Sequence, residues 1–198
     1  VDNAFANVLE FGNPHTQAPD AFVQAWGYSV SGGLTEEDII QRNETVIAQF
    51  SSENLANVDG VVSHYYYMDG RNAGTEYEQS IELIEDQISS IAELHKAWEL
   101  ATGREMISRT SEWNVLMRAE VEIGLRQLDP LMELFTSFLR NGFDALDFWS
   151  AQYKATSLAD ASGRLMAAGV LLDALRENII GTQVSEISKG DALNVYTF

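Results

Sequence analysis

The chain has 198 residues, of which 45% are hydrophobic, which is enough for one sizeable domain with a packed core. Its 30 acidic and 12 basic residues give a formal net charge of −18, which argues against nucleic acid and anionic membrane surfaces as partners. Cysteine is absent, so disulfides, thiolate metal sites and thiol nucleophiles are excluded. No apolar stretch approaches the ~20 residues of a membrane span, and no membrane insertion is expected. Such an acidic balance is most often only a well-solvated surface, and the more specific interpretation is a secreted, cell-surface or salt-adapted protein.

The predicted elements alternate between strands and helices in chain order. Strands are expected over 8–12, 58–67, 105–113 and 144–151, and helices over 35–55, 75–102, 120–139 and 162–178. The segment from 13 to 33 contains two prolines and Gly32-Gly33 and is expected to be a loop. Gly103 and Asn141-Gly142 are expected to end helices, and Pro130 to mark a bend or a restart.

This β-α order predicts parallel strands joined by right-handed crossovers, in the α/β class. No Gly-rich phosphate loop follows a strand, which leaves the (β/α)8 barrel as the preferred architecture. A whole barrel usually needs ~250 residues, and four βα units resemble half of one. Residues 1–180 are therefore predicted to form a half barrel, and the tail 181–198 a strand of a further element.

A half barrel leaves open edges and an uncovered interior. Completion by another chain, by a missing N-terminal segment or by a homo-oligomer is expected. The first residue is Val1 and not Met, which indicates a processed or truncated product.

Polar and aromatic residues recur where the predicted strands end, and barrel active sites lie at that end of the strands. We expect them, with one further tryptophan, to form a site. They are Asn13, Trp26, His64, Tyr66, Glu112, Trp113, Asn114, Trp149 and Gln152.

Glu112 is the residue most suggestive of chemistry, because a carboxylate at a strand end is costly to bury unless it is paired or functional. Regular alternation places it on one face with Ser108 and Thr110, and it places His64 with Tyr66. A salt-bridged surface glutamate, a hydrogen-bonded core histidine and tryptophans that only pack are the alternatives. His95 lies within a predicted helix and is expected to be solvated. No metal-ligand spacing is present, and neither metal nor cofactor is expected.

The ordered set of motifs resembles the second half of a clan A glycoside hydrolase of the arabinofuranosidase, xylosidase and agarase kind. The elements that match are His64-Tyr65-Tyr66, then Glu112-Trp113-Asn114, then Trp149, then a Gly- and Ala-rich helix over 167–172. The resemblance covers about residues 5–180 and implies strands five to eight of the barrel.

By that resemblance Glu112 is the nucleophile of a retaining mechanism, oriented by Tyr66 or His64, and the remaining site residues bind carbohydrate. Such enzymes also need a general acid/base, usually in an Asn-Glu pair after strand four, and this chain has no such pair at a suitable strand end. Hydrolysis of glycosidic bonds is therefore expected only if the missing half supplies the acid. The alternatives are a non-catalytic carbohydrate-binding or surface protein on the same scaffold, and a self-contained α/β domain of unrelated function.

Overall fold

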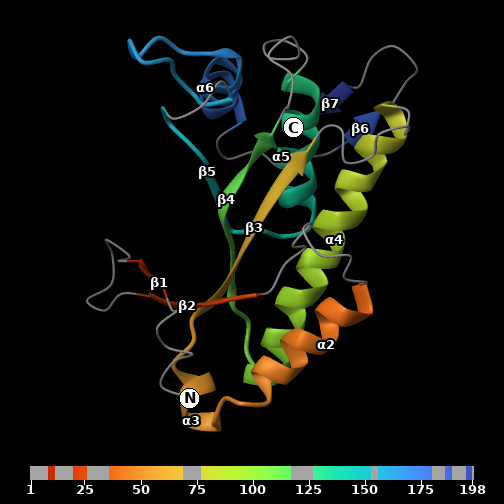
Figure 1. Cartoon of the computed structure of the whole chain (residues 1–198), viewed down its shortest axis with the longest axis vertical. Coiled ribbons are helices and arrows are strands. Elements are labelled where there is room, and N and C mark those ends of the chain that lie inside the picture. Colours follow the sequence, from red (N-terminus) through yellow and green to blue (C-terminus); the bar gives the residue numbers. More distant parts are fainter. Residues whose placement is uncertain are drawn as a thin grey trace. The chain divides into compact units, whose positions relative to one another are not determined.

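The computed structural model describes residues 9–11, 20–25, 36–68, 77–116, 127–152, 156–179, 186–188 and 195–197 (Figure 1). Strands and helices alternate along most of this part of the chain. In order they are β1 (Leu9–Phe11), β2 (Asp20–Gln24), α2 (Glu36–Ile47), α3 (Ser52–Ala56), β3 (Gly60–Met68), α4 (Tyr77–Thr102), β4 (Ile107–Leu116), α5 (Leu128–Arg140), β5 (Ala145–Phe148), α6 (Ala167–Ile179), β6 (Glu186–Ser188) and β7 (Val195–Thr197).

The main sheet has five strands in the order β1-β2-β3-β4-β5. Strands β2 to β5 run parallel and alternate with helices, which confirms the predicted α/β class. The strands β6 and β7 pair antiparallel in a separate sheet, so the tail does contain a strand.

The first parallel strand is not the one predicted from the sequence. The expected strand over 8–12 is present as β1, but it pairs antiparallel with β2 at the edge of the sheet. The first parallel strand is β2, which lies in the predicted loop and pairs with β3 from Phe22↔Gly60 to Gln24↔Val62. Its five residues are too few to give a clear alternation. The strand is stabilised instead by contacts with the rest of the fold. Its Phe22 and Val23 side chains are buried, and its backbone pairs with β3.

Two predicted helices are shorter in the structure. The helix expected over 35–55 is divided into α2 and α3, because the Ser51 side chain accepts a hydrogen bond from the Asn54 N–H and caps a new helix. The helix expected from 162 begins at Ala167 instead. Asp160 Oδ1 accepts hydrogen bonds from the backbone N–H groups of Ser162 and Arg164, and this local bonding competes with helix formation.

The predicted helix ends are confirmed at two glycines. Gly103 follows α4 with φ 69°, and Gly142 follows α5 with φ 77°, a left-handed conformation that favours glycine. Pro130 lies in the first turn of α5, where an absent N–H group costs no hydrogen bond.

The chain divides into two compact units. Unit 1 comprises Val1–Tyr65, Ser89–Ser111 and Gly142–Asp147, and unit 2 comprises Tyr66–Ile88, Glu112–Asn141 and Phe148–Phe198. Within the described residues, no helix has both the length and the apolar character needed to cross a membrane.

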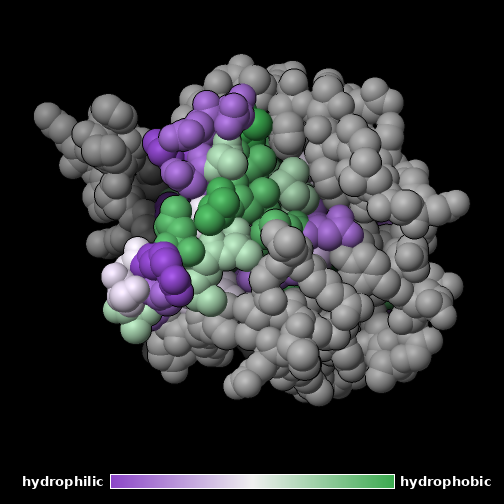
Figure 2. Space-filling model, turned by 90° about the horizontal axis from the view of Figure 1, so that it is seen from above, coloured by the Kyte–Doolittle hydropathy of each residue, from purple (hydrophilic) through white to green (hydrophobic). Residues whose placement is uncertain are grey.

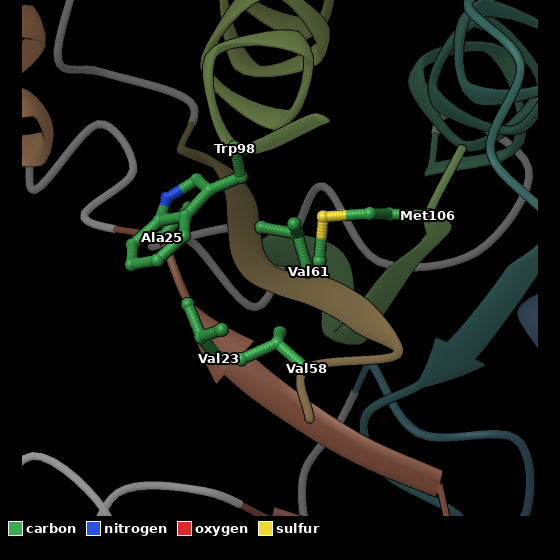
Figure 3. Packing of buried hydrophobic residues seen from close by; sticks show 6 residues of the cluster. All are labelled: Val23, Ala25, Val58, Val61, Trp98 and Met106. Atoms are coloured by element: carbon green, nitrogen blue, oxygen red, sulfur yellow. The ribbon is translucent and has the colours of Figure 1, made fainter. Parts of the chain in front are cut away.

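The core of unit 1 is built on side chains from β2, β3 and α4 and from residues directly beside β2, β3 and β4. Figure 3 shows six of them converging, and Trp98 is fully buried among them. Phe50 meets the Trp98 ring edge to face, with centroids 5.4 Å apart. The six buried members of this cluster are Val23, Ala25, Val58, Val61, Trp98 and Met106.

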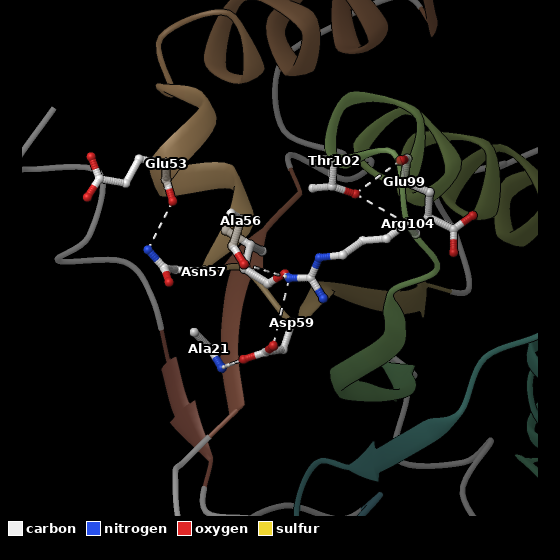
Figure 4. A network of polar contacts seen from close by, with 9 residues as sticks. Ala21, Glu53, Ala56, Asn57, Asp59, Glu99, Thr102 and Arg104 are labelled. Carbon is white, nitrogen blue, oxygen red and sulfur yellow. Dashed lines mark hydrogen bonds and ion pairs between the residues drawn. The ribbon is translucent and has the colours of Figure 1, made fainter.

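Polar groups tie the start of β3 to its neighbours in unit 1 (Figure 4). Arg104 donates to the carbonyls of Ala56 and Val58 and lies 3.7 Å from the Asp59 carboxylate. Asp59 in turn accepts a hydrogen bond of 2.9 Å from the backbone N–H of Ala21. These contacts fix the β2, β3 and β4 strand starts against one another.

The core of unit 2 is aromatic and centres on Trp113, which is 1% exposed. Its ring lies edge-on to Phe138 and Phe148, with centroids 5.9 and 5.2 Å away, and tilted against Phe135. Leu131 and Leu134 of α5 are fully buried. Strand β4 is therefore held against α5 by its own tryptophan.

Candidate functional site

The clearest polar contact in unit 2 joins two residues that the sequence singled out. The Tyr66 hydroxyl on β3 donates a hydrogen bond of 2.7 Å to Glu112 Oε2 on β4. Both side chains are half-buried. Burial, the hydrogen bond to Glu112 and the negative charge of that carboxylate all raise the pKa of Tyr66 above its ordinary value. Tyr66 therefore remains a neutral donor, and Glu112 receives a charge-assisted hydrogen bond.

A third predicted residue completes this cluster. The Trp149 ring meets the Tyr66 ring edge to face, with centroids 6.0 Å apart and planes at 89°. Trp149 directly follows β5, and its backbone N–H donates to the Trp113 carbonyl over 3.1 Å. Three successive parallel strands thus bring Tyr66, Glu112 and Trp149 together.

The strand that carries Glu112 is longer and less regular than predicted. It continues to Leu116, so Glu112 lies within β4 and not at its end. The carbonyls of Ser108 and Trp113 both accept hydrogen bonds from the β5 side, from the N–H groups of Asp144 and Trp149. Residues five apart on a regular strand would point their carbonyls to opposite sides, so β4 is irregular between Ser108 and Trp113. The two hydrogen bonds do not locate the irregularity more closely, so the expectation that Glu112 shares one face with Ser108 and Thr110 stays a prediction.

Asn114 is buried, and its carboxamide bonds to backbone groups. Its Nδ2 group donates to the carbonyls of Trp149 over 2.6 Å and Thr156 over 3.0 Å. Its Oδ1 atom accepts from the Val115 N–H over 2.6 Å. The Gln127 side chain donates to the same Thr156 carbonyl over 3.3 Å. Asn114 therefore organises the backbone beside the cluster, and a carbohydrate contact from it stays a prediction.

The structure places the other predicted site residues as follows. Trp113 lies in the aromatic core, 1% exposed. Gln152 is exposed and donates to the Asp160 carbonyl over 2.7 Å. His64 is half-buried on β3. Asn13 and Trp26 lie outside the described residues.

The expectation that His95 is solvated is wrong. His95 is 4% exposed, its Nδ1 atom lies 2.5 Å from the Ser108 hydroxyl, and its ring packs against Phe143. Burial lowers the pKa of His95 to about 3, so the ring is neutral at pH 7. The signal was present in the sequence, because His95 follows Ile91 by four residues and precedes Trp98 by three.

Across the described part of the chain, no group of three or more His, Asp or Glu side chains could hold a metal ion. The chain matches no family model, and no curated protein matches its sequence.

Proposed function

We propose that this chain contributes the nucleophile of a retaining glycoside hydrolase, as the C-terminal half of a (β/α)8 barrel. The observation that supports the proposal most is the 2.7 Å hydrogen bond from Tyr66 to Glu112 beside the Trp149 ring. A carboxylate that is held by a neutral donor and flanked by an aromatic ring suits attack on a sugar carbon.

In the proposed reaction a Glu112 oxygen forms a bond to the anomeric carbon while the bond to the leaving oxygen breaks. The leaving oxygen takes a proton from a general acid, and water later hydrolyses the glycosyl ester with that group acting as base. Tyr66 orients the attacking carboxylate. We assign a carbohydrate contact to Trp149, and carbohydrate contacts from His64 and Gln152 stay predictions.

The general acid/base comes from outside this chain in the proposal. Two carboxyl groups lie ~5–5.5 Å apart in a retaining site, and the resemblance assigns the second to a strand before the first parallel strand here. The other half of the barrel is then another chain, another segment of a longer protein, or a second copy.

Two features of the surface support an additional partner. Among the described residues, strand β5 is the last strand of the main sheet on its side, and edge strands invite pairing. Leu165 and Val170, at 48% and 57% exposure, leave apolar surface uncovered around the start of α6. On the face shown in Figure 2, hydrophobic side chains of the described residues gather in one group with hydrophilic ones at its border.

The test is nucleophile rescue in the native assembly, with aryl arabinofuranosides, xylosides and galactosides as substrates. We expect Glu112→Ala to lower kcat by at least about 10⁴-fold, because it removes the group that forms the covalent intermediate. Added azide should restore turnover and give a glycosyl azide of inverted anomeric configuration, since azide then attacks in place of Glu112. The matched control is Glu93→Ala, which removes an exposed carboxylate of α4.

Full hydrolysis by Glu112→Ala would overturn the nucleophile assignment. Rescue that gives only the retained configuration would assign Glu112 the acid/base role instead. Binding of sugar by the wild-type assembly without any hydrolysis would favour the non-catalytic carbohydrate-binding alternative.

A further inference from the structure

The carboxamide of Asn114 has all of its hydrogen-bonding positions occupied by backbone groups. Both hydrogens of its carboxamide nitrogen are used, one on the Trp149 carbonyl and one on the Thr156 carbonyl. Its oxygen is used by the Val115 N–H. A residue that is 1% exposed and bonded at all three positions has one fixed orientation.

The backbone of Trp149 is held on both sides by β4. Its N–H donates to the Trp113 carbonyl, and its carbonyl accepts from Asn114. The two bonds come from adjacent residues of one strand, immediately after Glu112. The peptide units on both sides of the Trp149 side chain are thus fixed by the strand that also bears the candidate nucleophile.

A continuous series of contacts leads from this backbone to the carboxylate. The Trp149 ring packs edge-on against the Tyr66 ring, and the Tyr66 hydroxyl donates to Glu112. A displaced indole would leave the phenol without its neighbour and free to turn away from the carboxylate. Printed contacts thus connect the Asn114 carboxamide to the Glu112 carboxylate through Trp149 and Tyr66.

We propose that Asn114 is a positioning residue, whose carboxamide holds the Trp149 backbone so that the indole keeps the Tyr66 hydroxyl on Glu112. This positioning role rests on the proposed function only where Glu112 is called a nucleophile. Asn114 touches no substrate in this assignment, and it replaces the predicted carbohydrate contact of that residue.

The test uses ¹⁹F NMR of the full chain labelled with 5-fluorotryptophan. Four tryptophans give four resonances, and Trp149→Phe identifies the one of Trp149. Asn114→Asp keeps the shape of the side chain but removes both donors, and we expect it to shift or broaden the Trp149 resonance. The Trp98 resonance in the core of unit 1 should stay within its linewidth, which reports that the variant is folded.

The matched control is Gln127→Glu, which removes the other donor to Thr156 and leaves the bond to Trp149 in place. We expect the Trp149 resonance to stay near its wild-type position there. An unchanged resonance in Asn114→Asp, or an equal change in Gln127→Glu, would overturn the proposal.

A measurement on the wild-type chain keeps the proposal falsifiable if Asn114→Asp does not fold. The Asn114 side-chain amide hydrogens should exchange with solvent at least about 10²-fold more slowly than those of Asn178, whose amide makes an exposed bond on α6. Equal exchange rates would overturn it. None of these readouts depends on hydrolysis, so a failure of Glu112→Ala to affect turnover would remove the proposed function and leave this inference standing.

Discussion

Two polar side-chain pairs on β4 differ in what surrounds them. In unit 1, Ser108 meets His95 of α4, a ring that is 4% exposed and packed against Phe143. In unit 2, Glu112 meets Tyr66 of β3 at 2.7 Å, and both side chains are half-buried. The first pair has one fully buried member, His95, whereas both members of the second pair retain partial access to solvent.

The difference in burial bears on the protonation chemistry that each pair can take part in. Complete burial keeps His95 neutral, and a histidine with a pKa of about 3 is a poor proton acceptor at neutral pH. Tyr66, whose pKa is raised by burial and by Glu112, donates to the Glu112 carboxylate, which is the nucleophile under the proposed function. Burial therefore distinguishes the two pairs better than residue type does.

The largest expected effect concerns the buried pair under acid. The folded state keeps His95 neutral down to about pH 3, while the unfolded chain takes up this proton near pH 6.5. The contribution of neutral His95 to the free energy of unfolding is therefore present above pH 6.5 and is lost as the pH falls towards 3. Between pH 7 and pH 4.5 the wild type should lose about 2.5 kcal/mol more stability than His95→Asn. Urea unfolding of both proteins at the two pH values measures this.

Other carboxylates titrate in the same range, but they do so equally in both proteins. An identical loss of stability in wild type and His95→Asn would show that His95 becomes charged in the folded state. Burial would then not distinguish the His95 pair from the Tyr66 pair.

An intermediate effect is expected at the half-buried pair. Tyr66→Phe should cost about 1–2 kcal/mol at pH 8, because it removes a hydrogen bond to a charged group. The pKa of Tyr66 is raised in the folded state, so its contribution is full below pH 10 and is lost as pH rises further. The stability gap between wild type and variant should therefore narrow from pH 8 to pH 10.5 in urea unfolding. His95→Asn serves as the control and should show no such narrowing.

The smallest effect on stability is expected at an ion pair that is exposed to solvent. Lys96 and Glu93 lie 2.6 Å apart on α4, with side chains 59% and 64% exposed. Lys96→Ala should change the free energy of unfolding by less than about 0.5 kcal/mol. A loss above 1 kcal/mol by urea unfolding would mean that distance, and not burial, sets the strength of these pairs.

The alternation of elements was predictable because it rests on local patterns. The stripe of Ile84, Ile88, Ile91 and Trp98 indicates α4, and the glycines after α4 and α5 mark their ends. Strand β2 was missed because its five residues gain their stability from pairing with β3. The break before α3 was missed because the Ser51 cap lies inside an otherwise helical pattern.

The cluster of Tyr66, Glu112 and Trp149 was predictable only in part. The sequence indicated Tyr66, Glu112 and Trp149 as neighbours, since parallel strands end at one edge of a sheet. It could not indicate that Asn114 bonds to two backbone carbonyls, because that depends on how the segment after β5 folds back. Nor could it reveal the irregularity of β4, since alternation arguments assume a regular strand.

Two glycines offer a criterion for recognising relatives of this chain. A side-chain carbon at Gly60 would lie 2.6 Å from the Ile107 carbonyl oxygen and would meet the Phe22 ring. One at Gly169 would overlap the Leu158 carbonyl. At both places the obstacle includes backbone, which cannot move aside as a flexible side chain can. A search for distant relatives should therefore weight glycine at these two positions above the acidic surface, which many unrelated sequences could reproduce.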